Sequence, residues 1–182
     1  MTDFVKIAIT RPEPYPYGLV LNEAKRINSI LENEEADFVH IRKPDSSFEI
    51  LKELISEIDS KFYRRLKLHD HFSLLDSFEL GGIHLNRRNP IPYQEAKSVS
   101  KSIHTLEEIE EAKSFDYFFI SPIFDSISKP GYKAYFDLKD LARRIKGTNA
   151  IALGGITPDK LPYLKSLGFK GAAMLSYYFP NE

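Results

Sequence analysis

Residues Asn149–Asp159 read NAIALGGITPD, and this stretch decides which fold we expect the chain to adopt. Its apolar run, Ala150–Leu153, is short and continuous, which is typical of a fully buried strand. The strand stops at Gly154-Gly155, two residues that tolerate positive φ and let a ligand approach the backbone closely. A helix start follows, with Thr157 as N-cap and Pro158 at the first helical position. The stretch therefore predicts a strand, a bare turn and a helix N-terminus whose N–H groups can bind an anion.

A second strand end of the same kind follows, where the strand Gly171–Leu175 stops at Ser176. Two such strand ends, last in the chain, resemble the phosphate site of a (β/α)8 barrel, which lies in the loops after strands seven and eight. A Gly-Gly pair alone more often only closes a loop. The two turns in this order favour a phosphate ligand at Gly154, Gly155, Leu175 and Ser176.

The overall composition predicts a single domain over residues 1–182. Hydrophobic residues make up 42% and charged residues 28%, which is ordinary for a globular protein, and a chain of this length buries roughly 70% of its unfolded surface. A net charge of −1 gives no electrostatic argument for a nucleic acid or membrane partner.

Several absences point to the cytoplasm. No apolar run approaches the ~20 residues that span a bilayer. The N-terminal MTDFVKIAIT has an early acidic residue and too short an apolar core for a signal peptide. The chain has no cysteine, which excludes disulfides, thiolate nucleophiles and thiolate metal sites. We therefore expect a cytoplasmic protein.

Short apolar runs alternate with helical patterns along the chain. The expected strands are Val5–Ile9, Phe38–Ile41, Leu66–His69, Gly82–Leu85, Ser98–Ile103, Tyr117–Ile120, Ala150–Leu153 and Ala172–Leu175. The expected helices between them are Leu19–Asn33, Phe48–Asp59, Leu106–Lys113, Leu138–Lys146 and Pro158–Ser166. Eight strands with alternating helices predict an α/β fold, a TIM (β/α)8 barrel. An open doubly wound sheet is the alternative, but the first strand is followed by RPEPYPYG and not by GxGxxG.

Three of the eight helices are expected to be short. The intervals His71–Glu79 and Asn86–Lys97, after strands three and four, hold only short or irregular helices. After strand eight only SYYFPNE remains, so the eighth helix is expected to be truncated. The flank between strands eight and one is then expected to be covered by a second copy in a homodimer or by the chain's own aromatic tail, Tyr177, Tyr178 and Phe179.

Polar side chains follow almost every expected strand, at the end of a barrel where active sites lie. His104 follows strand five in KSIHT, and histidine is the side chain best suited to move protons near neutral pH. The competing interpretation is that His104 only packs at the strand end. His84 is expected to be a barrel histidine with satisfied hydrogen bonds. In His69-Asp70-His71, the alternation of side chains along an extended chain places only His69 and His71 on the same side. A zinc site needs at least three ligands, and since the sequence offers no clear third one, we predict no zinc site.

The loop Ser121–Tyr132 after strand six, SPIFDSISKPGY, carries polar side chains that can donate to an anion. Ser126, Ser128 and Lys129 are the donors, and lysine is a compact cationic anchor. A solvated surface lysine is the commoner case. The position of Lys129 beside the phosphate turns is what favours the functional interpretation.

Six segments, in order, resemble the thiamine-phosphate synthase and thiazole tautomerase superfamily of TIM barrels. They are DFVHIRKPD, GGIHL, KSIHTLEE, DYFFISPIFDSISKPG, AIALGGITPDKL and GFKGAAMLS, and they run from about Ile9 to Ser176. The resemblance implies an enzyme that binds thiazole phosphate, a small molecule, at Gly154, Gly155 and the Leu175-Ser176 turn, with Ser126 and Lys129 nearby.

In the synthase branch, the resemblance implies that a pyrimidine diphosphate is joined to thiazole phosphate with Mg²⁺ as cofactor. His40, Arg42, His69 and Asp70 would lie on the pyrimidine and pyrophosphate side, and Asp70 would bind the metal. The chain departs from this pattern: Pro44 stands at the lysine position of an Arg-x-Lys pair, with Lys43 one step early, and Asn89 stands at the second aspartate position. Arg87 and Arg88 could replace part of the missing charge.

In the tautomerase branch, the resemblance lies in the HIR segment and in the tolerated loss of the metal ligands, so that no cofactor is implied. His104 would then act as general acid and base, with Arg42 and Lys129 as further catalytic residues. The tautomerase is our first expectation and the synthase the alternative. A non-catalytic barrel that binds a thiamine precursor is the third hypothesis.

Overall fold

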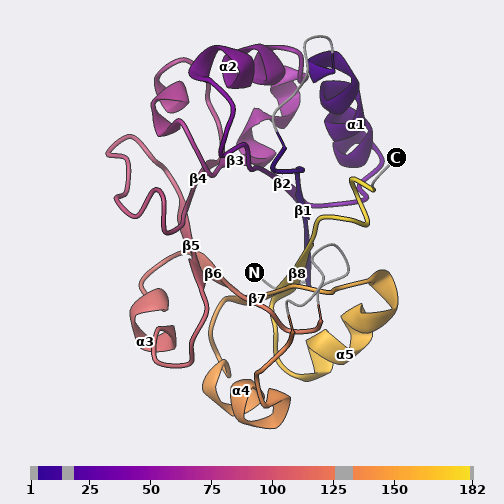
Figure 1. Ribbon diagram of the computed structural model, residues 1–182, viewed down its shortest axis with the longest axis vertical. Helices are drawn as coiled ribbons and strands as arrows, with labels where there is room; N and C mark the ends of the chain where they lie inside the picture. Colours follow the sequence, from indigo (N-terminus) through magenta and orange to yellow (C-terminus); the bar gives the residue numbers. More distant parts are fainter. Residues whose placement is uncertain (1–3, 14–18, 126–132, 181–182) are drawn as a thin grey trace. The chain divides into compact units, whose positions relative to one another are not determined.

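The computed structural model describes residues 4–13, 19–125 and 133–180, and its strands form one closed barrel in the order β1 to β8. Figure 1 shows the strands joined by helices and loops on the outside. The strands are β1 Val5–Ile9, β2 Phe38–Ile41, β3 Leu66–Leu68, β4 Gly82–Leu85, β5 Val99–Ile103, β6 Tyr117–Ile120, β7 Ala150–Leu153 and β8 Gly171–Met174. The predicted TIM barrel is confirmed.

The strands pair in parallel, and their registers bring residues from distant parts of the sequence side by side. His40 lies opposite Lys67 across the β2–β3 pair, and Lys67 lies opposite Gly82 across β3–β4. On the other side, Leu153 of β7 lies opposite Ala173 of β8. Because parallel strands end at the same edge of their sheet, the loops after β2, β3 and β4 are neighbours, as are those after β7 and β8.

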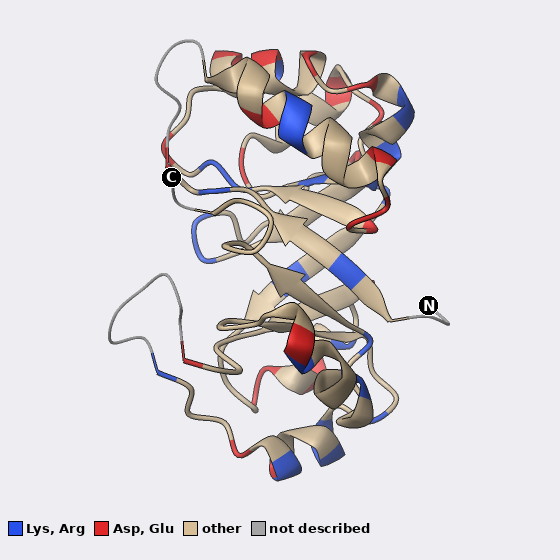
Figure 2. Ribbon diagram, turned by 90° about the vertical axis from the view of Figure 1, so that its right-hand side faces the viewer, with Lys and Arg blue, Asp and Glu red and all other residues tan. Residues whose placement is uncertain are grey.

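The helices pack through apolar faces. The elements are α1 Val20–Glu32, α2 Phe48–Ser56, η1 Ser60–Arg65, η2 Phe72–Asp76, α3 Ile109–Ala112, α4 Leu138–Arg144, η3 Pro158–Lys160 and α5 Leu161–Ser166. The buried residues of α1 recur at three- to four-residue spacing, as an amphipathic helix requires: Val20, Ala24, Ile27, Ile30 and Leu31. In Figure 2, charged residues of both signs lie on the helices and loops, whereas the strands are mostly uncharged.

The loop after β3 forms the short 3-10 helix η2, as expected. The loops after β4 and β8 differ from the expected short helices. After β4 no helix is present among the described residues 86–98, because Asn86 and Asn89 close a turn through both backbone amides and Pro90 and Pro92 remove two helix donors. The short helix predicted after strand four is therefore wrong.

The chain after β8 forms a turn in place of a truncated helix. The amides of Tyr178 and Phe179 both donate to the carbonyl of Leu175. Tyr178 is fully buried and Phe179 is buried, whereas Tyr177 is exposed. Two rings of the aromatic tail are therefore buried within the chain itself. This agrees with the alternative in which the tail, and not a second copy, provides the cover. The homodimer stays a prediction.

By their contacts the residues group into two compact units, one of residues 8–99 and one of residues 1–7 with 100–182. We call them the N-terminal unit and the C-terminal unit and describe each by itself. The prediction of a single domain stays a prediction. Among the described helices, none is long and apolar enough to cross a membrane.

Candidate active site

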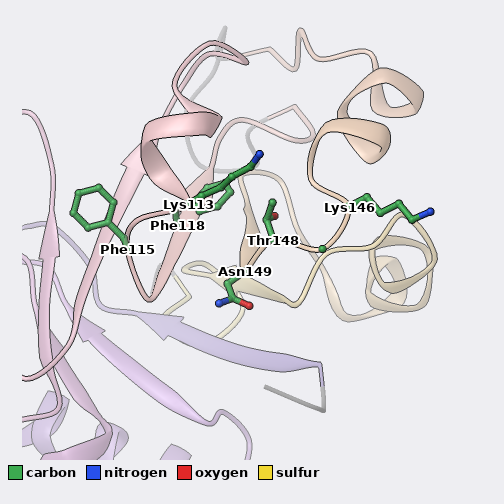
Figure 3. Close-up of a pocket in the computed structure, with 7 residues that line it drawn as sticks. Lys113, Phe115, Phe118, Lys146, Thr148 and Asn149 are labelled. Carbon is green, nitrogen blue, oxygen red and sulfur yellow. The ribbon is translucent and has the colours of Figure 1, made fainter.

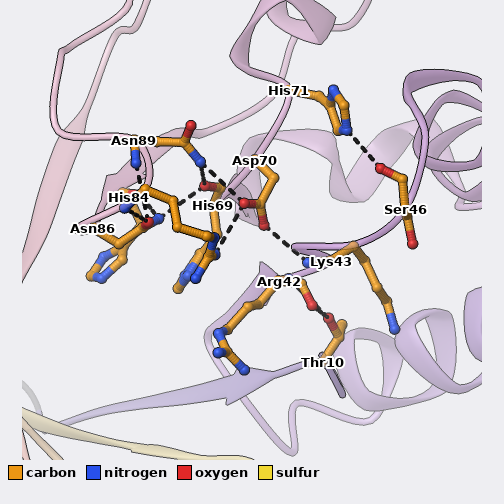
Figure 4. Close-up of polar contacts among 11 residues, drawn as sticks. Thr10, Arg42, Lys43, Ser46, His69, Asp70, His71, His84, Asn86 and Asn89 are labelled. Atoms are coloured by element: carbon orange, nitrogen blue, oxygen red, sulfur yellow. Dashed lines mark hydrogen bonds and ion pairs between the residues drawn. The ribbon is translucent and has the colours of Figure 1, made fainter. Parts of the chain in front are cut away.

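Asp70, the second residue after β3, is the centre of a polar network in the N-terminal unit (Figure 4). Its side chain is 8% exposed. Oδ1 accepts from Arg88 Nη2 at 3.0 Å and from Asn89 Nδ2 at 3.1 Å. Oδ2 accepts from the backbone N–H of Lys43 at 3.1 Å. Each of these three contacts donates a hydrogen bond to Asp70, so the carboxyl group acts only as an acceptor in this network.

The turn Asn86–Asn89 brings Arg88 and Asn89 to this carboxylate. The side chain of Asn86 accepts from the backbone N–H of Arg88 at 3.0 Å and of Asn89 at 3.2 Å. Asparagine at the first position of a turn commonly makes such bonds. The sequence NRRN therefore forms a rigid turn whose second arginine pairs with Asp70.

Asn89 occupies the expected second metal position but does not present an oxygen there. Its Nδ2 donates to the carbonyl of His69 at 2.8 Å as well as to Asp70. Both partners are acceptors, which determines the orientation of the amide. Mg²⁺ binds oxygen ligands, most often one or two carboxylates with substrate phosphates. With one carboxylate, already paired with Arg88, these residues do not fit a two-aspartate magnesium site.

Arg42 follows β2 and adds a second guanidinium to this group. Its backbone N–H donates to the hydroxyl of Thr10 at 2.9 Å. No side chain in the described part of the chain forms a hydrogen bond or ion pair with its guanidinium. Partial burial lowers the pKa of Arg42, and the nearby charge of Arg88 lowers it further, while Asp70 opposes both. Arg88 pairs with Asp70, and the charge of Arg42 interacts with both without a direct contact. The three groups together leave a net positive charge, which suits an anion with several negative charges.

Lys43 does not contribute to this positive charge. Its fully buried Nζ donates to the carbonyl of Arg11 at 2.7 Å and pairs with Glu23 Oε2 at 3.0 Å. Burial lowers the pKa of Lys43 and raises the pKa of Glu23 to about 7, although the ion pair acts in the opposite direction. The lysine that stands one step early in the expected Arg-x-Lys pair thus packs under α1, away from Asp70.

His40 and His69 lie together in the interior. His40 Nδ1 and His69 Nε2 are 2.8 Å apart and share a hydrogen bond. Their exposures are 0% and 4%, so neither ring lies at the surface, and a role for them on the pyrimidine side stays a prediction. His71 lies apart, in the left-handed region with φ 53°, and its Nε2 contacts the carbonyl of Ser46 at 2.7 Å. The expectation that His69 has no third metal-ligating neighbour is wrong, since His40 and His84 both lie next to it.

In the C-terminal unit, His104 follows β5 with a defined ring orientation. Its Nδ1 lies 3.1 Å from the carbonyl oxygen of Ser121 and 3.3 Å from that residue's hydroxyl. A carbonyl accepts only, so Nδ1 carries the proton and Nε2 is left as the basic nitrogen. No described residue bonds to Nε2. This is the geometry of a general base.

Two neighbouring side chains hold the backbone of His104. Glu108 Oε2 accepts from the N–H groups of His104 and Thr105, at 2.8 and 2.9 Å. The hydroxyl of Tyr135 donates to the carbonyl of His104. The strand end is therefore fixed on both sides of the histidine, which a catalytic group requires.

The two predicted phosphate turns lie side by side after β7 and β8. Gly154 and Gly155 adopt positive φ, 100° and 61°. A Cβ added to Gly155 would meet the carbonyl oxygen of Asp125 at 2.2 Å, so glycine is required there. Within the described residues, the N–H groups of Gly155 and Ser176 donate to no protein acceptor. These N–H groups are available to an anion, and phosphate binding at this place stays a prediction.

Lys160 is a cation at this turn that sequence reasoning missed. Its Nζ donates to the carbonyl of Gly155 and lies 4.6 Å from the centre of the Phe124 ring. The signal was its place in η3, directly after the turn, but a lysine on a helix is usually a surface residue. Ser126 and Lys129, which were predicted to lie near the phosphate, are outside the described residues.

A model of the thiamine monophosphate synthase family matches residues 8–177, nearly the whole chain. The chain belongs to this family. A solved structure of thiamine phosphate pyrophosphorylase from Bacteroides thetaiotaomicron is 36% identical, with a TM-score of 0.78, covering 96% of this chain and 83% of that one.

Curated relatives support the same family. The thiamine-phosphate synthase of Dictyoglomus turgidum is 28% identical over 133 residues, 67% of this chain and 59% of that protein. The thiamine-phosphate synthase of a Synechococcus strain is 25% identical over 169 residues, 86% of this chain and 48% of that protein. The chain thus spans about half to three fifths of the length of these two relatives.

A hollow in the C-terminal unit lies away from the polar strand ends. Figure 3 shows a hollow of about 290 Å³ at the start of β6 and β7, lined by Lys113, Phe115, Phe118, Lys146, Gly147, Thr148 and Asn149. It lies at the amino ends of these strands, whereas active sites of TIM barrels lie at the carboxyl ends. We assign it no role in the chemistry.

Proposed function

We propose that this chain is a thiamine-phosphate synthase, which joins a pyrimidine diphosphate to thiazole phosphate and releases pyrophosphate. In that reaction the bond from the pyrimidine methylene carbon to the diphosphate oxygen breaks, with both electrons leaving on pyrophosphate. A bond from the thiazole nitrogen to the same carbon forms. The family membership and the 36% identical pyrophosphorylase support this reaction over the tautomerase that the sequence favoured first.

The observation that carries the proposal is the presence of two guanidinium groups: Arg88, which pairs with Asp70, and Arg42, whose charge interacts with both. A tautomerase substrate has one phosphate, which the turns after β7 and β8 can bind. A second cationic group is explained by a second phosphate-bearing substrate. Arginine forms two parallel hydrogen bonds with phosphate oxygens and remains charged. The two guanidinium groups would stabilise the charge that develops on the leaving pyrophosphate.

These arginines also replace positive charge that would come from a metal ion held by a second aspartate. The family is compatible with Mg²⁺, but the donor set around Asp70 lacks the second carboxylate, so we derive no step through the ion. An incoming diphosphate would compete with Asp70 for Arg88. The Asp70–Arg88 pair, 3.0 Å long, would then keep the arginine in place until substrate arrives.

The test is formation of thiamine phosphate and pyrophosphate, in equal amounts, from the two purified substrates. We expect Arg42→Gln and Arg88→Gln to lower kcat/KM by about 100-fold or more, as removal of one transition-state donor does. Arg144→Gln is the matched control, since Arg144 is exposed and pairs with Asp140 on α4. The proposal is refuted if all three variants turn over equally, or if the parent chain, with both arginines intact, forms no product.

Thiazole tautomerisation is the second candidate, and the orientation of His104 favours it. Its Nε2 is the nitrogen left to exchange a proton with a substrate bound by its phosphate. Under this alternative the carboxythiazole phosphate is converted to its aromatic tautomer without the pyrimidine substrate. Proton NMR of the carboxythiazole phosphate separates the two candidates. A His104→Ala variant as active as the parent chain would remove the histidine from that role.

A further inference from the structure

Three histidines from three neighbouring strands meet inside the N-terminal unit. His40 comes from β2, His69 directly follows β3, and His84 comes from β4. One ring nitrogen of each lies within 4.8 Å of the other two. All three are buried, with exposures of 0%, 4% and 0%. Figure 4 shows His69 and His84 beside the asparagines of the neighbouring turn.

Two of the three rings stack on each other, and the third is edge-on to both. His69 and His84 are stacked, with ring centres 4.3 Å apart. His40 is edge-on to both, at 5.1 and 5.2 Å. Its Nδ1 is 2.8 Å from His69 Nε2. Zinc–nitrogen bonds of 2.0–2.1 Å at tetrahedral angles require ligand nitrogens about 3.3 Å apart. His40 and His69 would therefore separate by about 0.5 Å. The ring of His84 would turn out of its stack on His69 and approach by up to about 1.5 Å.

The protonation state of the cluster suits a metal ligand. Burial lowers the pKa of all three histidines, and the charge of Lys67 lowers those of His40 and His84 further. The rings are therefore neutral at pH 7, and neutral imidazole is the form that binds metals. Imidazole suits zinc, copper, nickel and cobalt, whereas Mg²⁺ prefers oxygen.

Asparagines of the turn after β4 donate hydrogen bonds to the main-chain carbonyls of two of the three histidines. Asn86 Nδ2 donates to the carbonyls of His69 and His84, at 3.0 and 3.4 Å. Asn89 Nδ2 donates to the carbonyl of His69 at 2.8 Å. These contacts fix the main chain of His69 and His84, from which the two rings extend.

We propose that His40, His69 and His84 form a site for one divalent transition-metal ion of the zinc type, with water in the fourth position. The site is separate from Asp70 and from any magnesium that the synthase reaction uses. The buried ammonium of Lys67, which donates to Ser98, lies close enough to repel the ion and limits its affinity. Removing that charge should therefore strengthen binding.

The experiment uses the full chain without a histidine tag, stripped of metal with a chelator, and Zn²⁺ or Co²⁺ as the probe. We expect one Zn²⁺ per chain by competition with a chromophoric chelator, and the intense visible absorption of tetrahedral Co²⁺. His84→Gln should weaken binding by at least the ~10–100-fold that loss of an outer-shell partner costs. His71→Gln, which removes a histidine outside the cluster, should bind as the parent does. Lys67→Met should bind more tightly.

Folding of each variant is checked by near-ultraviolet circular dichroism, and His40→Gln replaces His84→Gln if the latter does not fold. Millimolar Mg²⁺ should not displace the Zn²⁺. The proposal fails if the parent binds no Zn²⁺ at micromolar concentration. It also fails if loss of His84 or His40 leaves the affinity unchanged, or if Asp70→Asn abolishes binding while the histidine variants retain it.

Discussion

Acidification should destabilise this protein through the buried histidines, and His84 gives the clearest case. Burial, assisted by the charge of Lys67, lowers the pKa of His84 to about 3. The unfolded chain has an ordinary histidine pKa of about 6.5. Between these values the unfolded chain takes up a proton that the folded chain does not, so the free energy of unfolding falls as the pH falls. This contribution to stability is fully present above about pH 6.5.

The size of the effect follows from linkage. From pH 7 to 5.5 the His84 contribution to the free energy of unfolding falls by about 1 kcal/mol. His40 and His69 act in the same direction. Glu23 acts in the opposite direction: burial raises its pKa to about 7, so the folded chain takes up the proton and is stabilised over the same range.

Variants separate these opposing contributions. We expect the loss of stability between pH 7 and 5.5 to be about 1 kcal/mol smaller in His84→Gln than in the parent. In Glu23→Gln the loss should be larger than in the parent. Urea unfolding at the two pH values, with a chelator present to exclude metal, measures both. If His84→Gln and the parent lose the same stability, the buried neutral state of His84 is refuted.

Asn89→Asp places a second carboxylate about 3 Å from Asp70, where repulsion favours a bound cation. Mg²⁺ binding by calorimetry should then tighten at least 10-fold, and no change would show that the amide is not what weakens the metal site. Gly155→Ala should cost more stability than Gly168→Ala in thermal unfolding. Both glycines have positive φ, which costs alanine ~1–2 kcal/mol, but only at Gly155 does the new Cβ meet backbone, the carbonyl of Asp125. Equal losses would contradict the close packing of this turn.

Much of the fold could be read from the sequence because it is set by local patterns. Short apolar runs alternating with amphipathic helices require a parallel sheet covered by helices, and the barrel follows. The phosphate turns were also local, since a strand, a glycine pair and a Thr-Pro helix start lie next to each other in the chain. The prediction of a helix after strand four was wrong because Asn86 begins a turn and two prolines follow it.

The parts that the sequence did not predict depend on contacts between strands. Alternation along one strand suggested His71 as the partner of His69, but register across β2, β3 and β4 brings His40 and His84 to it instead. The direction of Lys43 depends on the buried carboxylate of Glu23, contributed by α1. Pairing of Arg88 with Asp70 depends on the conformation of the turn between them. None of these distances is encoded by spacing in the sequence.

The central claim is that main-chain amides at the ends of β7 and β8 bind the phosphate of a thiazole substrate. An NMR titration of ¹⁵N-labelled protein with thiazole phosphate, and with the same thiazole alcohol lacking the phosphate, tests it most directly. We predict large downfield amide shifts at Gly155 and Ser176 with the phosphate and small ones with the alcohol. Unchanged resonances at both residues on saturation with thiazole phosphate would contradict the claim.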